Sequence, residues 1–136
     1  MQEVREIMSP KIVTIGEADH LLTAEDIMTL GEVRHMPVVK AGRLVGVVSQ
    51  RDLLRASPSH LGGEDAEDLR AFLGAVEVGS VMSSPAVVID PKSSVRDAAR
   101  VMAENKIGCL PVMDGTGELL GMVTETDVLR AMADGG

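Results

Sequence analysis

Two short motifs in this chain each join an apolar run to a hydroxyl and a carboxylate. Residues 46–52 read Gly-Val-Val-Ser-Gln-Arg-Asp, and residues 121–127 read Gly-Met-Val-Thr-Glu-Thr-Asp. A hydroxyl residue three positions before an Asp is typical of a helix start. At a strand-to-helix junction the same groups can also hold an anion and accept two hydrogen bonds from a vicinal diol such as a ribose. The motifs therefore allow either helix capping or recognition of a ribose nucleotide.

Both motifs belong to a long internal repeat. Val4–Ser9 recurs at residues 78–83 and Met36–Val38 at residues 110–112, both at an offset of 74, whereas residues 42–56 recur at an offset of 75. Each half of the 136 residues is near the size at which a hydrophobic core becomes marginal. We therefore expect the two copies to pack as one module, with any site occurring twice.

The apolar patterns predict the order β-α-β-β-α in each copy. A strand over residues 11–15 precedes a helix capped by Asp19, and residues 86–89 precede a helix capped by Ser94. Hairpins are expected over residues 36–48 and 110–123, and second helices begin at Ser49 and Thr124. This order predicts an α/β fold of the α+β type, with two repeats packed as one pseudo-symmetric module.

The domain boundaries follow the repeats. The first repeat is predicted at residues 1–56 and the second at residues 78–136, with a linker at residues 57–77. In the linker, Leu69, Phe72, Leu73 and Val76 have helical spacing, which predicts a short amphipathic helix. This helix either packs against the module or covers a site.

Composition excludes several classes of function. A net charge of -8 disfavours binding to a phosphate backbone, so we expect no nucleic acid partner. No apolar run approaches the length of a membrane span, and the start lacks a signal-peptide pattern, so a cytoplasmic protein without membrane insertion is expected. Cys109 is the single cysteine and fits a buried, inert thiol.

The chain shows no set of residues for catalysis or metal binding. No nucleophile lies beside a recognisable base, so we expect no enzyme. His20, His35 and His60 fall in different predicted elements without zinc spacing, so no metal site is expected.

The chain resembles a tandem pair of CBS domains, the cystathionine β-synthase type repeat that forms a Bateman module. The resemblance rests on the paired openings that end in Met-Ser, on Arg34–Val38 with Cys109–Val112, and on the two Gly-to-Asp motifs. It covers residues 4–56 and 78 to about 132. It implies a regulatory module that binds AMP, ADP, ATP or S-adenosylmethionine in clefts between the repeats and requires no other cofactor.

The resemblance also implies the site residues of two clefts. In it, Asp127 and Asp52 hold ribose hydroxyls, Thr124 and Ser49 contact phosphate or ribose, and aliphatic side chains hold adenine. One cleft would contain Met122, Thr124 and Asp127 with Ile12, Val13, Arg34, His35 and Pro37. The other would contain Val47, Ser49, Arg51 and Asp52 with Ala86, Val87, Gly108, Cys109 and Pro111.

The two implied clefts differ in charge. Arg34 and His35 precede the proline of the first cleft, whereas Gly108 and Cys109 precede that of the second. A phosphorylated ligand is therefore expected at the Asp127 cleft, although Arg51 adds a cation to the other. For Arg34 the alternative to a ligand contact is a solvated surface guanidinium, and for His35 it is a side chain that packs against the sheet.

The resemblance further implies a homodimer and a fused or separate effector protein. The helices that begin near Ser49 and Thr124 are the expected dimer contacts. The alternative is a constitutive assembly module without a physiological ligand, in which Ser49, Asp52, Thr124 and Asp127 only cap helices.

Overall fold

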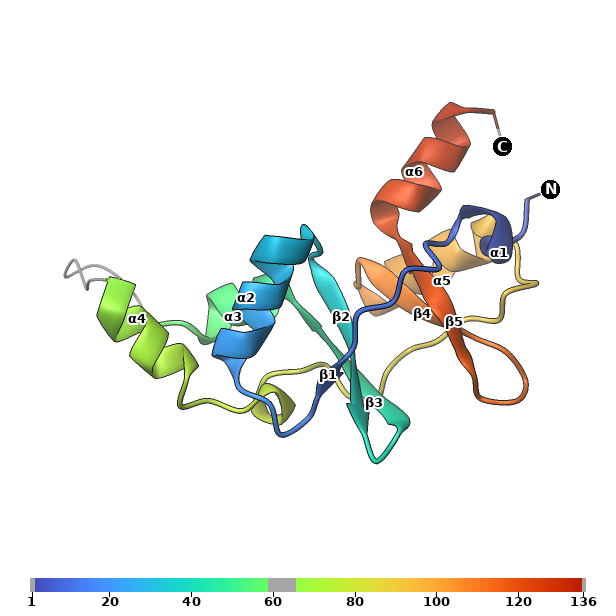
Figure 1. Ribbon diagram of the computed structural model, residues 1–136. Helices are drawn as coiled ribbons and strands as arrows, with labels where there is room; N and C mark the ends of the chain where they lie inside the picture. The colour runs from blue at the N-terminus through green and yellow to red at the C-terminus, as the bar shows by residue number, and fades with distance from the viewer. Residues whose placement is uncertain (1, 59–65, 136) are drawn as a thin grey trace. The chain divides into compact units, whose positions relative to one another are not determined.

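Short helices and strands alternate along the chain, as the repeat predicts. The computed structural model describes residues 2–58 and 66–135 (Figure 1). Its helices and small sheets place the protein in the predicted α+β class. The chain divides into Val13–Pro85, the first-repeat unit, and Met1–Ile12 with Ala86–Gly136, the second-repeat unit.

The first-repeat unit is built on a three-stranded sheet. β1 (Ile15–Gly16) pairs in parallel with β2 (His35–Lys40), which pairs antiparallel with β3 (Arg43–Ser49). Only Ala41 and Gly42 separate β2 from β3, and both have positive φ, as a tight hairpin of this twist requires.

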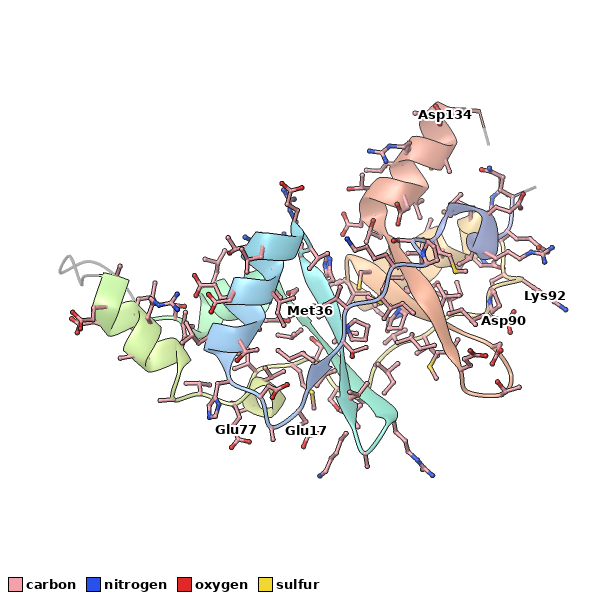
Figure 2. The ribbon with its side chains drawn as sticks, in the orientation of Figure 1. Glu17, Met36, Glu77, Asp90, Lys92 and Asp134 are labelled. Carbon is pink, nitrogen blue, oxygen red and sulfur yellow. The ribbon has the colours of Figure 1, made fainter. Side chains whose placement is uncertain are left out.

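Helices complete the first-repeat unit. α2 (Leu21–Gly31) buries Leu21, Ala24 and Met28 in the same core as Met36 of β2, which is labelled in Figure 2. α3 (Gln50–Ala56) follows β3 directly. The predicted linker helix is α4 (Ala66–Leu73), which buries Leu73 and packs against α2; a short 3-10 turn, η1 (Val78–Ser80), follows. The part of the linker at residues 59–65 lies outside the described residues.

The second-repeat unit repeats this plan with a smaller sheet. β4 (Cys109–Met113) and β5 (Leu119–Thr124) form an antiparallel hairpin, flanked by α5 (Val95–Asn105) and α6 (Glu125–Ala133). α1 (Val4–Ile7) packs against both helices (Figure 1). Val4 is fully buried in the core that these elements share with Leu110, Val112 and Val123.

The first strand of each repeat is shorter than predicted. Only Ile15 and Gly16 of the first repeat are in a strand, and in the second repeat only Ile89 forms a bridge, to Val112. Ile15 and Ile89 are equivalent, and both are buried next to the equivalent residues Val38 and Val112. The β-branched residues before them have strand propensity, but a strand also needs a neighbour for its backbone hydrogen bonds.

Asp19 does not cap α2, contrary to the sequence prediction. The helix begins at Leu21 with His20 in the cap position, and the Asp19 carboxylate accepts a hydrogen bond from the Gly16 N–H at 2.8 Å. Ser94, the equivalent of His20, does cap α5 and accepts from the Asp97 N–H at 3.0 Å. The repeat alignment, which matches residue 20 with residue 94, marks the cap position more accurately than residue type.

The two repeats exchange their opening segments. Ser9 from the start of the chain pairs with Met122 of β5, with N···O distances of 2.8 and 3.0 Å. Ser83 pairs in the same way with Val47 of β3, at 2.9 and 3.0 Å. The sequence repeats therefore differ from the compact units, because each Met-Ser opening joins the strand of the other repeat.

The close approach of each opening explains the glycine that begins each motif. A Cβ placed on Gly121 would lie 2.5 Å from the Ser9 carbonyl oxygen and 2.9 Å from Met8 Sδ. On Gly46 it would lie 2.6 Å from the Ser83 carbonyl oxygen and 2.8 Å from Met82 Sδ. Since these distances are below van der Waals contact, only glycine lets the paired backbones approach so closely.

Gly121→Ala tests this contact, with Gly115→Ala as its matched control. The added methyl group must displace backbone at position 121, whereas nothing lies within 4 Å of the Cβ position at Gly115. We expect Gly121→Ala to lower the free energy of unfolding by about 1–3 kcal/mol, the usual cost of overpacking. Gly115→Ala should have little effect in the same urea titration. Equal midpoints for both variants and the wild type would contradict the close approach.

Candidate ligand-binding site

Each Gly-to-Asp motif forms a complete capping box. Ser49 Oγ accepts from the Asp52 N–H at 3.1 Å, and Asp52 Oδ2 accepts from the Ser49 N–H at 2.8 Å. Asp127 Oδ2 likewise accepts from the Thr124 N–H at 2.8 Å, while Thr124 Oγ1 faces the Asp127 N–H at 3.3 Å. The reciprocal bonds satisfy two backbone donors at the start of α3 and of α6. The capping interpretation of both motifs is therefore confirmed.

Capping uses only one oxygen of each carboxylate. Thr124 Oγ1 also donates to Asp127 Oδ2, at 3.0 Å. Within residues 2–58 and 66–135, no hydrogen bond reaches the second carboxylate oxygen of Asp52 or Asp127. Both Asp residues are half-buried. Each can cap its helix and still accept a hydrogen bond from a hydroxyl group outside the protein.

The residues before each proline lie beside the hydroxyl of their own repeat. His35 is opposite Ser49 in the β2–β3 ladder, and the Arg34 carbonyl accepts from the Gln50 N–H at 2.8 Å. Cys109 is opposite Thr124 in the β4–β5 ladder, and the Gly108 carbonyl accepts from the Glu125 N–H at 3.0 Å. Each unit thus joins one hydroxyl–carboxylate pair with one pre-proline segment at a single strand end.

The structure groups the predicted residues by unit. Pro37 and Val47 are opposite each other in the first-repeat unit, as Pro111 and Met122 are in the second. Val13 belongs to the first-repeat unit, whereas Ile12, Ala86 and Val87 belong to the second. The pairing across repeats that the resemblance implies stays a prediction.

The cations near the first capping box lie at the surface. Arg34 and Arg51 are exposed, and neither forms an ion pair among the described residues. His35 is half-buried beside Ser49. The guanidinium groups are therefore accessible to an anionic ligand.

An open hollow of about 230 Å³ adjoins Asp127 in the second-repeat unit. Its other lining residues are Gln2, Ile7, Arg130, Ala131 and Asp134. Asp134, labelled in Figure 2, lies at the end of α6. Sequence reasoning did not single out Arg130, although its position three residues after Asp127 places both on adjacent turns of one helix.

The described residues show neither a metal-binding cluster nor a helix that could span a membrane. The described residues contain no group of three or more His, Cys, Asp or Glu side chains that could hold a metal ion. His60 lies outside them. None of the described helices has the length and apolar character needed to cross a membrane.

Comparison with known proteins identifies the family. The CBS domain model matches residues 4–59 and 78–134. The chain belongs to the CBS domain family. A CBS domain-containing protein of Dictyostelium discoideum is 35% identical over 127 residues, covering 93% of this chain and 88% of the relative. YhcV, a CBS domain-containing protein of Bacillus subtilis, is 29% identical over 128 residues, covering 94% of this chain and 84% of YhcV.

A solved structure supports the same relationship. The crystal structure of CBSX2 in complex with AMP matches this CBS pair with a TM-score of 0.80 and 28% identity, covering 98% of each chain. The CBS domain of a membrane protein from Sphaerobacter thermophilus matches with a TM-score of 0.78 and 28% identity, covering 94% of this chain and 86% of that one. Similarity in fold thus extends over nearly the whole CBS pair.

Burial sets the chemistry of Cys109, one of the predicted site residues. Desolvation raises the pKa of its thiol to about 12, so the folded thiol stays neutral. In the unfolded chain a thiol ionises near pH 8.5. The folded state therefore loses stability as pH rises from about 8.5 toward 12, by up to roughly 1.4 kcal/mol per pH unit.

We expect this loss to disappear in Cys109→Ala. The measurement is the free energy of unfolding in urea at several pH values. The slope of this free energy against pH in the variant is subtracted from the slope in the wild type.

The burial of Cys109 can also be tested by its reactivity. A disulfide reagent at about pH 8 should react slowly with the folded protein and quickly with one thiol after denaturation. Rapid reaction of the folded protein would show that Cys109 is not buried as described.

Proposed function

We propose that this CBS pair is a regulatory module that binds an adenine nucleotide, with AMP as the first ligand to test. The observation that carries the proposal is the duplicated capping box, in which each Asp keeps one carboxylate oxygen unused by its helix. CBSX2, a relative of similar fold across 98% of both chains, has been solved with AMP. A carboxylate that accepts from both hydroxyls of a ribose would explain why Asp occurs at the same position of both motifs.

The proposed site joins residues of both repeats. Asp127 and Thr124 would bind the ribose and phosphate with Arg34 and His35 nearby, and Asp52 and Ser49 would do so in a second cleft. Ile12, Val13, Ala86 and Val87 would contact adenine, together with Met122 and Val47. The nucleotide would act as a signal only if it bound one arrangement of the repeats more tightly than another.

The module would act on other proteins and not on a substrate of its own. We propose that it forms a homodimer and passes the signal to a fused or separate effector, and that it is not an enzyme. ADP, ATP and S-adenosylmethionine are the other candidate ligands. A cytoplasmic location stays a prediction.

Asp127→Asn separates ligand binding from capping. Asn is a good cap residue, so the stability of the free protein should change little. Its amide oxygen must take the place of Oδ2 to accept from Thr124, which turns an NH₂ donor toward the position of the ribose hydroxyls. Loss of a charge-assisted hydrogen bond costs roughly 1.5–3 kcal/mol, so AMP affinity should fall by about tenfold to a hundredfold.

Calorimetric titration with AMP measures this loss, with GMP as the comparison ligand. Asp97→Asn is the matched control, because Asp97 also lies in the first turn of a helix but is not part of either Gly-to-Asp motif. Its carboxylate instead forms an ion pair with Arg100. Asp52→Asn should remove only the other site from the stoichiometry. Unchanged AMP affinity in both Asp52→Asn and Asp127→Asn would favour the alternative, a constitutive assembly module.

Arg34→Ala tests the predicted contact with phosphate. If the guanidinium faces phosphate, this variant should weaken AMP binding and flatten its salt dependence, while adenosine binding stays nearly unchanged. Arg43→Ala is the control, since Arg43 is equally exposed but lies at the opposite end of the β2–β3 hairpin. Equal losses for AMP and adenosine in calorimetry would remove Arg34 from the phosphate role.

A further inference from the structure

Each Met-Ser opening places a methionine sulfur against the glycine of the strand that it joins. Met8 Sδ would lie 2.9 Å from a Cβ on Gly121, and Met82 Sδ would lie 2.8 Å from a Cβ on Gly46. The two methionines are equivalent in the repeat, and each packs against the core of its own unit. The same sulfur contact therefore occurs once in each unit.

The openings themselves lie at the surface. Ser9 and Ser83, which follow the two methionines, are exposed, and so are the two residues after each of them. Each opening pairs with its strand through two backbone hydrogen bonds of 2.8–3.0 Å. A pairing this short and this exposed separates locally at a low cost in free energy. The packing of the methionine side chain is therefore an important part of what holds each opening in place.

Exposure separates Met8 and Met82 from most other methionines of the chain. Both are half-buried, so a molecule as small as peroxide can reach them. Four methionines are buried in the two cores or beside them: Met28, Met36, Met102 and Met122. Met132 is 64% exposed, but it lies on α6 and in neither opening. Oxidation by peroxide should thus reach Met8, Met82 and Met132 well before the buried sulfur atoms.

We propose that Met8 and Met82 are oxidation sites at which peroxide releases each opening from its strand. A lone pair of the thioether sulfur attacks one peroxide oxygen, the S–O bond forms as the O–O bond breaks, and water leaves after proton transfer. The sulfur is oxidised by two electrons and the peroxide is reduced by two. The product, a methionine sulfoxide, is polar and disrupts apolar packing. Its oxygen turns to water, which removes the side chain from the glycine and the core.

The two openings are not held equally. Ser84 Oγ donates to the Val45 carbonyl at 2.9 Å and so adds a third hydrogen bond to the opening at Met82. Pro10, the residue equivalent to Ser84, has no hydroxyl group and no N–H to donate. The opening at Met8 therefore keeps fewer contacts after oxidation. Since it pairs with β5, the motif that ends at Asp127 should be loosened more than the one that ends at Asp52.

Amide hydrogen exchange after treatment with hydrogen peroxide tests the release directly. The N–H groups of Met122 and Val47 donate to the two openings. Once peptide mass mapping shows both methionines oxidised, exchange at these two amides should rise by about tenfold, which corresponds to about 1.4 kcal/mol of local stability. The rise should be larger at Met122. The Ile89 N–H, which donates to a carbonyl of β4, should keep its rate, and methionine sulfoxide reductase should restore the other two.

The variant that carries both Met8→Leu and Met82→Leu keeps an apolar side chain in each contact and removes both thioethers. Exchanges of Met and Leu are usually well tolerated, and peroxide should leave the exchange rates of this variant unchanged. Met132→Leu is the control and should respond to peroxide as the wild type does.

Three results would overturn the proposal. One is a double Leu variant that responds to peroxide as strongly as the wild type does. Another is a wild-type protein with sulfoxide at positions 8 and 82 in which the amides of Met122 and Val47 keep their rates, a measurement that needs no variant to fold. The third is oxidation of the buried methionines before these two. No nucleotide is present in any sample, so the outcome is independent of the proposed function.

Discussion

The close approach of two backbones at Gly46 and at Gly121 fixes the two strands that lead into the candidate sites. Each glycine lies under a Met-Ser opening from the other repeat, and a single added Cβ would fall within 2.6 Å of a carbonyl oxygen. The opening then pairs with the next residue of the strand, Val47 or Met122. Two residues further along lies the hydroxyl that caps the following helix. The glycine contact thus positions the strand that leads into each candidate site.

Capping and ligand binding share one carboxylate but not one oxygen atom. Asp127 Oδ2 holds the start of α6 through Thr124, as Asp52 Oδ2 holds the start of α3 through Ser49. Because the cap fixes the side chain in one orientation, the second oxygen has a defined direction before any ligand arrives. Such preorganisation lowers the entropy lost on binding. A helix cap and a ribose-binding group are therefore compatible roles for the same residue.

Local patterns in the sequence predicted much of the fold. The internal repeat and its change of offset predicted both hairpins, and the Ser49 and Thr124 motifs predicted the starts of two helices. Both predictions succeeded because turns and helix caps depend on a few adjacent residues. The exchange of opening segments was not predictable in this way, since backbone pairing between Ser9 and Met122 leaves no pattern in either segment alone. The glycines were its one visible signal. Residues 11–14 failed as a strand because pairing partners, and not propensity, decide strand length.

In the candidate site, too, local features could be predicted from the sequence and tertiary contacts could not. Residue types and spacing identified both hydroxyl–carboxylate pairs, and the repeat alignment would have marked His20 in place of Asp19 as a cap position. Sequence did not indicate that Arg130 lines a hollow with Asp127, because this depends on how α1 packs against α6. It also did not show that Arg34 and His35 lie beside Ser49 of their own repeat.

The most direct test of the central claim is a nuclear magnetic resonance titration that follows the amide N–H groups of Ser49 and Thr124 as AMP is added. These two groups donate to Asp52 and Asp127, so a hydroxyl that binds the same carboxylates must change their chemical shifts. We expect both amides to be among those with the largest shifts for AMP and for adenosine. Saturable AMP binding that leaves both amides unmoved would contradict it.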